Sequence, residues 1–227
     1  MIIGAYAFPT FGRKRSEVGV GLRHILNGSY GLDMLVAPEF TNLTLQEMTQ
    51  LSIMDKGTLL IPGSSMVREG SNAYNRAYVL RGGDVLHIYD KKSFRTSGGL
   101  YDFDYLQDKA GRPVMERGRR SGVFSIGGIT YGLEICADHD QKTLKNEGAK
   151  ELDYQIVLGT GIVIRDPSVV VKREGAVIAV DGGVTDPHNP VRPSASVEVE
   201  GNIIAPERII KIGAAPTRDD RLYIFSV

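Results

Sequence analysis

The sequence predicts an α/β protein in which helices and strands form layers around mixed β-sheets. Short apolar runs that end at proline or glycine recur along the chain, as buried strands do. Two pairs of such runs are joined by Gly82-Gly83 and Gly127-Gly128, and this pattern is typical of β-hairpins. Segments with helical spacing of apolar residues lie between other strands, which favours helices packed on a sheet.

The first ninety residues predict strands alternating with helices, followed by a hairpin. One helix is expected to begin at Ser16, a good N-cap, and to stop at Asn27-Gly28. A second helix is indicated by Leu45, Met48 and Leu51. The expected strands are 2–8, 33–38, 58–62, 73–80 and 84–89, and the expected helices are 16–27 and 43–55.

The rest of the chain predicts a long loop, a second hairpin and further strands. Residues 95–120 are polar, rich in glycine and without period, as binding segments or lids often are. The expected elements beyond are strands at 122–126, 129–135, 154–158, 168–172, 176–181, 195–199 and 222–227 and a helix at 141–150. The chain has no repeat, linker or break in composition, so we predict one domain over 1–227.

Composition argues against several classes of partner. The 27 basic and 27 acidic residues balance, so no net field would hold a nucleic acid or an acidic membrane. No apolar run approaches the roughly eighteen residues that span a bilayer, and the first residues lack a signal-peptide pattern. A single cysteine excludes an internal disulfide and a multi-cysteine zinc site. We expect a cytoplasmic protein without a metal or other cofactor.

Three reactive side chains each follow a predicted strand. Glu39 comes after Leu-Val-Ala-Pro, Lys91 after His-Ile-Tyr-Asp and Cys136 after Leu-Glu-Ile. Strand ends are where layered α/β folds commonly display catalytic groups. Taken singly, the two charged residues fit solvated surface positions and the cysteine fits a packed core thiol.

Six short phrases around these residues occur in a recognisable order. They are Pro38-Glu39, Ile61-Pro-Gly-Ser64, Tyr74-Asn-Arg-Ala-Tyr78, Gly83-Asp-Val-Leu86, Tyr89-Asp-Lys91 and Gly132-Leu-Glu-Ile-Cys136-Ala-Asp138. Together they resemble the nitrilase superfamily, the carbon–nitrogen hydrolases, over residues 30 to 160. The resemblance implies an αββα sandwich of two mixed β-sheets between helical layers. It also implies a homodimer or higher homo-oligomer that associates through the helical surface near the nucleophile.

The resemblance further implies a Glu–Lys–Cys triad formed by Glu39, Lys91 and Cys136. A free thiol has a pKa of about 8.5, so attack at neutral pH needs a base or a positive field. Glu39 would take the thiol proton, and Lys91 would stabilise the oxyanion together with the Ala137 backbone N–H. The expected activity is that of an amidase, which cleaves the non-peptide C–N bond of a small amide through a thioester.

Several further residues are candidates with a structural alternative. Lys92 is adjacent to Lys91, but Lys91 keeps the family's spacing from Tyr89. Glu116 is the candidate for a second glutamate, with a loop salt bridge as the alternative. Glu-Ile-Cys resembles the glutaminase domains of glutamine-dependent NAD synthetases, so Glu134 is a candidate substrate-binding residue or a salt-bridge partner. The other candidate substrate-binding residues are Tyr101 and Arg95.

Other readings of the same residues stay open. Nitrile hydrolysis or acyl transfer could use the same triad, and a non-catalytic binding or scaffold protein could keep the same fold. Cys136 and His139 could form a thiol–imidazole pair. A metal site at Asp138-His139-Asp140 is disfavoured because adjacent side chains splay apart. The expected partner is a small-molecule amide or nitrile.

Overall fold

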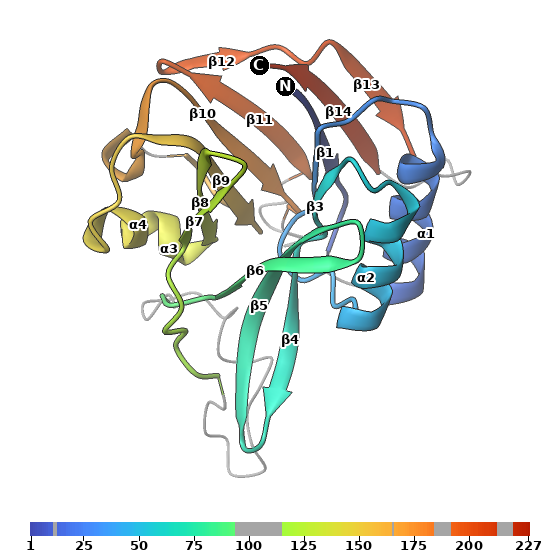
Figure 1. The fold of residues 1–227 in the computed structure, drawn as a ribbon, viewed down its shortest axis with the longest axis horizontal. Coiled ribbons are helices and arrows are strands. Elements are labelled where there is room, and N and C mark those ends of the chain that lie inside the picture. Colours follow the sequence, from blue (N-terminus) through green and yellow to red (C-terminus); the bar gives the residue numbers. More distant parts are fainter. Residues whose placement is uncertain (11–12, 94–114, 165, 184–191, 213–219) are drawn as a thin grey trace.

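The computed structural model describes residues 1–10, 13–93, 115–164, 166–183, 192–212 and 220–227. Two β-sheets face each other, and helices lie on the outer side of each (Figure 1). The predicted αββα sandwich of two mixed sheets is therefore confirmed. Among the described residues, no helix is both long and apolar enough to cross a membrane.

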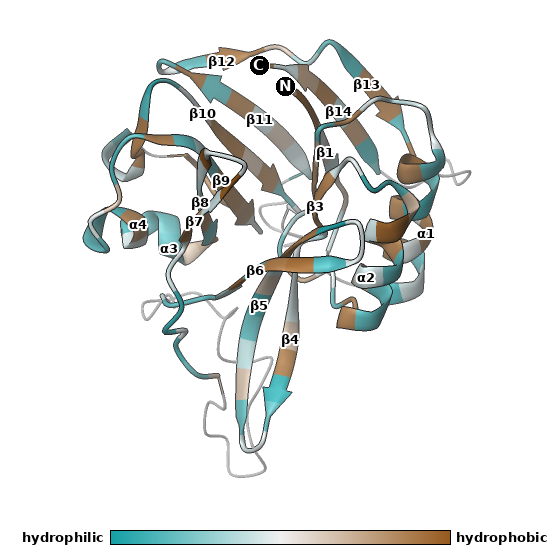
Figure 2. Ribbon diagram, viewed as in Figure 1, coloured by the Kyte–Doolittle hydropathy of each residue, from teal (hydrophilic) through white to brown (hydrophobic). Residues whose placement is uncertain are grey.

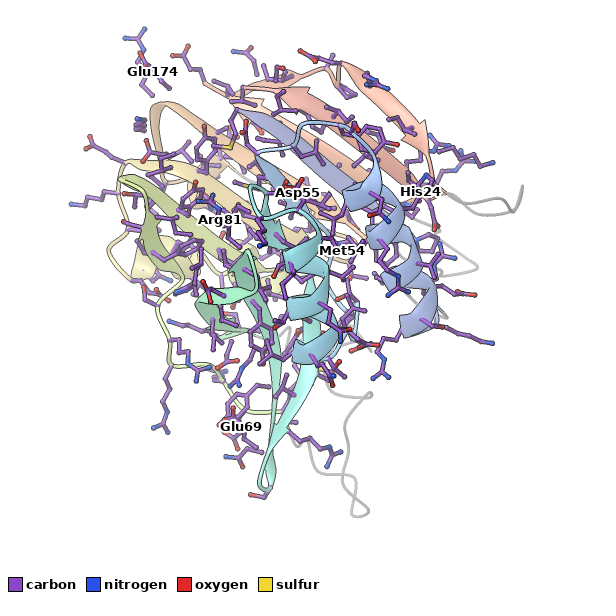
Figure 3. The ribbon with its side chains drawn as sticks, turned by 45° about the vertical axis from the view of Figure 1, so that its right-hand side comes forward. His24, Met54, Asp55, Glu69, Arg81 and Glu174 are labelled. Atoms are coloured by element: carbon purple, nitrogen blue, oxygen red, sulfur yellow. The ribbon has the colours of Figure 1, made fainter. Side chains whose placement is uncertain are left out.

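The larger sheet has eight strands in the order β13-β14-β1-β2-β3-β5-β4, with β6 paired to β5. The pairs β1–β2 and β2–β3 are parallel and the others are antiparallel, so the sheet is mixed. Its strands are β1 Ile2–Ala7, β2 Met34–Val36, β3 Leu59–Ile61, β4 Ser64–Glu69, β5 Asn72–Arg81, β6 Asp84–Asp90, β13 Arg208–Lys211 and β14 Arg221–Ser226. The β4–β5 hairpin extends away from the sandwich, and Glu69 lies near its tip (Figures 1 and 3).

The second sheet has six strands in the order β12-β11-β10-β9-β8-β7. Its central pairs, β8–β9 and β9–β10, are parallel, and the outer pairs are antiparallel. Its strands are β7 Val123–Ile126, β8 Ile129–Ile135, β9 Leu152–Gly159, β10 Val171–Asp181, β11 Ser194–Val199 and β12 Asn202–Ile204.

The helices divide between the two outer faces. Helices α1 Arg15–Asn27 and α2 Leu45–Met54 cover the larger sheet, while the short helices α3 Ala137–Asp140 and α4 Thr143–Asn146 lie against β8 (Figure 1). A 3-10 turn, η1, spans Asp166–Ser168. Thr44 caps α2 by exchanging hydrogen bonds with Glu47, and Asp55 follows its last residue (Figure 3).

Two main cores follow from the alternation of side chains along the strands. In β1, Ile3, Ala5 and Ala7 pack between the two sheets, whereas Tyr6 points toward the helices with Phe8 beyond it. All five are fully buried. In Figure 2 the central strands are largely apolar and the tip of the β4–β5 hairpin is polar.

Some sequence predictions about element boundaries were wrong. Helix α1 begins at Arg15 and its N-cap is Lys14, whose N–H faces the Glu17 carboxylate at 3.4 Å, so Ser16 lies inside the helix. The helix expected at 141–150 is only α4, Thr143–Asn146, which begins after Lys142, a residue with a left-handed backbone and φ of 55°. The strands expected at 168–172 and 176–181 are replaced by one strand, β10, which begins at Val171 and has an irregular register between Val171 and Ala176.

Candidate active site

Glu39 and Lys91 form an ion pair that is closed off from water. Glu39 lies in the turn after β2, and Lys91 directly follows β6. Lys91 Nζ is 2.9 Å from Glu39 Oε1, and the side chains are 0% and 1% exposed. The turn is fixed at its next residue, because Phe40 has φ of 61° and its N–H donates to Ser64 Oγ. Burying two charges costs desolvation energy that can exceed their mutual attraction, so stability alone does not explain a buried pair of this kind.

Asn75 on β5 donates to the same carboxylate. Its Nδ2 lies 2.7 Å from Glu39 Oε1, and the residue is 1% exposed. The backbone also joins these positions, since the Lys91 N–H donates to the Asn75 carbonyl at 2.9 Å. Sequence reasoning did not single out Asn75. Its only signal was a place inside one of the six phrases.

A second buried ion pair fixes the register of β5 and β6 next to the site. Arg76 lies directly opposite Asp90, with Nε–Oδ1 and Nη2–Oδ2 distances of 2.5 and 3.0 Å. Asn75 precedes Arg76, and Lys91 follows Asp90. Because neighbouring side chains in a strand point to opposite faces, Asn75 and Lys91 both point away from this pair and toward Glu39. Arg76 also contacts Glu69.

Cys136 stands on a sharp turn between β8 and α3. Its φ and ψ are 48° and −104°, a strained conformation for a residue with a side chain. The Cys136 N–H donates to the Leu158 carbonyl at 2.8 Å, and Sγ lies 3.9 Å from the Thr160 carbonyl. The residue is 9% exposed and belongs to the core between the sheets. Such strain is found where a reactive group must be held in one orientation.

Asp181, at the end of β10, orders the loop that carries Thr160. Its carboxylate accepts backbone N–H groups from Gly161 at 2.8 Å, Ile162 at 2.7 Å and Gly183 at 2.6 Å. Asp181 is only 4% exposed. It therefore fixes the backbone segment that the Cys136 thiol faces.

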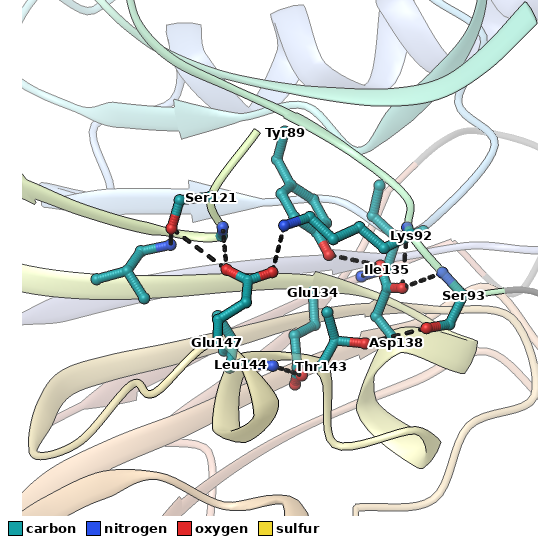
Figure 4. A network of polar contacts seen from close by, with 12 residues as sticks. Tyr89, Lys92, Ser93, Ser121, Glu134, Ile135, Asp138, Thr143, Leu144 and Glu147 are labelled. Atoms are coloured by element: carbon teal, nitrogen blue, oxygen red, sulfur yellow. Dashed lines mark hydrogen bonds and ion pairs between the residues drawn. The ribbon is translucent and has the colours of Figure 1, made fainter. Parts of the chain in front are cut away.

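Asp138, near the start of α3, connects that helix to the end of β6 and the residues that follow it (Figure 4). Its Oδ2 accepts from the Tyr89 hydroxyl at 2.8 Å, and its Oδ1 accepts from the backbone N–H groups of Lys92 at 3.0 Å and Ser93 at 2.6 Å. The Ile135 N–H adds a contact of 3.3 Å from the same side as the cysteine. One carboxylate thus ties the end of β6 to the start of α3.

Burial raises the pKa of Asp138 to about 7. The Tyr89 hydrogen bond, the Lys91 ammonium and the backbone donors of Ser93 and Lys92 act in the opposite direction, but they do not offset the loss of hydration. Because the Lys91 charge lowers the pKa of Asp138, it acts on the helix that directly follows Cys136.

The two adjacent lysines have different surroundings. Lys91 is fully buried against Glu39, whereas Lys92 is partly exposed and pairs with Glu147 on the side of α4 (Figure 4). Of the two lysines, Lys91 is the one that contacts Glu39, and its role in catalysis stays a prediction.

Glu134 and His139 belong to a buried network behind β8. His139 Nδ1 lies 2.8 Å from Glu134 Oε2, and Glu134 also accepts from Gln155 Nε2 and the Leu144 N–H. Glu134, His139 and Gln155 are all 0% exposed. β8 ends at Ile135 and the chain turns at Cys136, so Glu134 and Cys136 do not lie on one face of the strand. The contacts of Glu134 match the structural alternative.

The remaining sequence candidates are placed as follows. Ala137 is fully buried as the first residue of α3. Glu116 is exposed, and its N–H donates to the Ala73 carbonyl at 2.8 Å. Arg95 and Tyr101 lie outside the described residues. Within the described ranges, no group of three or more His, Cys, Asp or Glu side chains could hold a metal ion.

The fold matches solved structures of proteins that share little sequence with this chain. It is similar to the glutamine-dependent NAD+ synthetase of Acinetobacter baumannii, at a TM-score of 0.66 and 17% identity, over 98% of this chain and 44% of that protein. It is also similar to XC1258 of Xanthomonas campestris, a CN-hydrolase superfamily protein with an arsenic adduct in its active site, at 0.65 and 14%, over 98% and 90%.

A third similar structure is a mutant of the amidase from Nesterenkonia sp. AN1, in which acrylamide has added to the active-site cysteine. Its TM-score is 0.60 at 13% identity, over 100% of this chain and 93% of that protein. No protein-family model and no curated protein sequence matches the chain.

The chain has the sandwich fold of carbon–nitrogen hydrolases. The solved structures that it resembles include a CN-hydrolase superfamily protein, a member of the nitrilase superfamily, a carbon–nitrogen hydrolase and an amidase. It spans about nine tenths of the length of the CN-hydrolases but less than half of the synthetase.

Proposed function

We propose that the protein is an amidase-type hydrolase that cleaves the non-peptide C–N bond of a small amide through a Cys136 thioester. The observation that carries the proposal is the buried Glu39–Lys91 pair, whose Nζ–Oε1 distance is 2.9 Å. Asp138 ties the end of the Lys91 strand to the helix that starts after the strained Cys136 turn. The CN-hydrolase and amidase neighbours support the same class of reaction.

In the acylation step, Glu39 accepts the thiol proton while Cys136 Sγ forms a bond to the amide carbon. The carbonyl oxygen becomes an oxyanion, stabilised by the Lys91 ammonium and the Ala137 N–H. Loss of one such donor in other enzymes costs about 3–4 kcal/mol of transition-state stabilisation. The C–N bond then breaks, Glu39 returns its proton to the departing amine or ammonia, and a thioester remains.

In the deacylation step, water takes the place of the amine. Glu39 removes a proton from the water, whose oxygen bonds to the thioester carbon. The C–S bond breaks, the carboxylic acid leaves, and the proton carried by Glu39 returns to the Cys136 sulfur. Lys91 and Ala137 act on the second oxyanion as on the first.

Glu116, Tyr101 and Arg95 remain candidates of the same proposal. Glu116 would assist proton transfer, and Tyr101 and Arg95 would contact the substrate. Glu116→Gln, Tyr101→Phe and Arg95→Met test them, through kcat for the first and through KM for the other two. We also propose that residues 1–227 form one carbon–nitrogen hydrolase domain and that the protein is a homo-oligomer. Light scattering, which gives the mass in solution, tests the oligomer.

The function is tested by ammonia release from a panel of primary amides, N-carbamoyl compounds and nitriles. We expect turnover of at least one amide by the wild type and none by Cys136→Ala. The control is Ser168→Ala, a substitution at another buried position, which should keep the activity of the wild type. The share of the acyl group that is transferred to added hydroxylamine, compared with the share released to water, separates acyl transfer from hydrolysis. A protein that turns over nothing in the panel and gains no adduct at Cys136 would instead be a scaffold that keeps the fold.

A further inference from the structure

We propose that Asn75 is a positioning residue that holds the Glu39 carboxylate in one orientation by donating a hydrogen bond to the oxygen that Lys91 also contacts. The inference rests on the proposed roles of Glu39 and Cys136. It adds a residue outside the Glu–Lys–Cys triad.

The chemistry of the contact decides how the Asn75 amide is turned. Glu39 Oε1 lies 2.7 Å from the Asn75 amide, and an ionised carboxylate can only accept hydrogen bonds. The NH2 end of the amide must therefore face Glu39. Because Lys91 Nζ reaches the same oxygen at 2.9 Å, two donors from neighbouring strands meet at one atom. A carboxylate held at one oxygen from two directions cannot rotate freely about its last bond.

The second end of the Asn75 amide argues against a purely structural role. Asn75 Oδ1 is buried and has no hydrogen-bond partner among the described residues. A buried amide that builds a structural network has both ends bonded, since an unsatisfied polar atom is unfavourable. The contact that Asn75 makes with its side chain in the described part of the chain is the one to Glu39.

The position of Asn75 is itself fixed by its neighbours. The Arg76–Asp90 pair sets the register of β5 and β6, and the Lys91 N–H donates to the Asn75 carbonyl at 2.9 Å. Asn75 and Lys91 therefore move as one unit relative to Glu39. This is the arrangement that a fixed general base needs.

The test uses alkylation of Cys136 by iodoacetamide, which needs no knowledge of the substrate. Cys136 is the single cysteine of the chain, so each adduct in the intact mass reports on this thiol. The variants are Asn75→Ala, which removes the donor, and Asn75→Asp, which keeps the shape and replaces the donor with a carboxyl. Asn72→Ala, a partly buried position on the same strand, is the matched control.

We expect Asn75→Ala to slow alkylation at pH 7 by about tenfold or more, the effect of one lost hydrogen bond to a charged group. Asn75→Asp is expected to be slower still at pH 7, because two carboxylates then face each other. Its rate relative to wild type should rise toward pH 5, as the new carboxyl gains a proton and donates again. Asp138, whose pKa is about 7, is present in both proteins, so ratios to wild type remove its contribution.

A flat ratio for Asn75→Asp between pH 5 and 8 would overturn the proposal, and so would Asn75→Ala reacting within twofold of wild type. Thermal melts identify variants that do not fold. If Asn75→Ala is among them, the pH slope of the isosteric Asn75→Asp decides alone. Because alkylation does not require turnover, a failure here is distinct from a failure to find an amide substrate.

Discussion

The Tyr89 hydroxyl donates to Asp138 Oδ2 at 2.8 Å and joins the two sheets where β6 ends and α3 begins. Tyr89 precedes Lys91 by two residues, and Asp138 follows Cys136 by two. The contact therefore sets the spacing between the proposed oxyanion-stabilising lysine and the proposed nucleophile. The Lys92 and Ser93 N–H groups bind the other oxygen of Asp138, so the hydroxyl is one of three donors that make this link.

Asp138 gives a dependence of stability on pH with a definite sign. Burial raises its pKa from 3.8 to about 7, so between these values the folded state binds more protons than the unfolded state. The stabilising contribution is fully present below about pH 4 and is lost as the pH rises to about 7. The size is on the order of 4 kcal/mol. Urea denaturation should show the wild type losing stability relative to Asp138→Asn over this range, whereas a constant difference would contradict the assignment.

Lys91→Ala is expected to destabilise the protein by about 3–5 kcal/mol, because it leaves the Glu39 carboxylate buried without the positive charge that pairs with it. Lys92→Ala is the matched control. Lys92 and Glu147 are each 20% exposed, so their pair is worth about 1 kcal/mol or less. Denaturant midpoints compare the two variants, and equal losses would count against a special role for the buried pair.

Asp90→Ala and Glu69→Ala separate the two partners of Arg76. Asp90 is 5% exposed and Glu69 is 51% exposed. We expect Asp90→Ala to cost about 3–5 kcal/mol and Glu69→Ala about 1 kcal/mol or less. Alkylation of Cys136 should slow only in Asp90→Ala, because the register of β5 and β6 positions Asn75 and Lys91. If a folded Asp90→Ala variant is alkylated at the wild-type rate, the register of β5 and β6 does not determine the reactivity of Cys136.

Asp181→Asn is expected to loosen the loop that faces the thiol. The amide keeps one acceptor oxygen, so the Ile162 N–H, now 2.7 Å from Oδ2, loses its partner at a cost of about 1–3 kcal/mol. Hydrogen exchange should become faster at Ile162. The control is Asp153→Asn, whose carboxylate accepts the Thr130 N–H far from this loop. Unchanged exchange at Ile162 would show that other contacts hold the loop.

Sequence reasoning found the layers of the fold because buried strands and hairpin turns are local signals. It missed β4, β12 and β13, which were either too short or too exposed to show a clear apolar period. β4 begins at Ser64, which pairs with Ala77 of β5, the next strand along the chain. The strand becomes exposed toward Glu69, so no run of apolar residues marks it in the sequence.

The site shows the same limit. Glu39, Lys91 and Cys136 could be named because their surrounding phrases keep a family order. Asn75, Asp138 and Asp181 act through partners that lie 36, 49 and 20 residues away along the chain. Asp138 was considered only as a metal ligand with its direct neighbours. Its actual partners come from the opposite sheet, which only the packing of the two sheets could show.

The central claim is that Cys136 is acylated by an amide with Glu39 as the base. Intact-mass analysis of the protein incubated with the amide panel tests it most directly, with peptide mapping to locate the adduct. We predict an acyl adduct on Cys136 that forms at least tenfold more slowly in Glu39→Gln, whose neutral side chain cannot take the thiol proton. No adduct with any compound, or equal rates in the wild type and Glu39→Gln, would contradict the account.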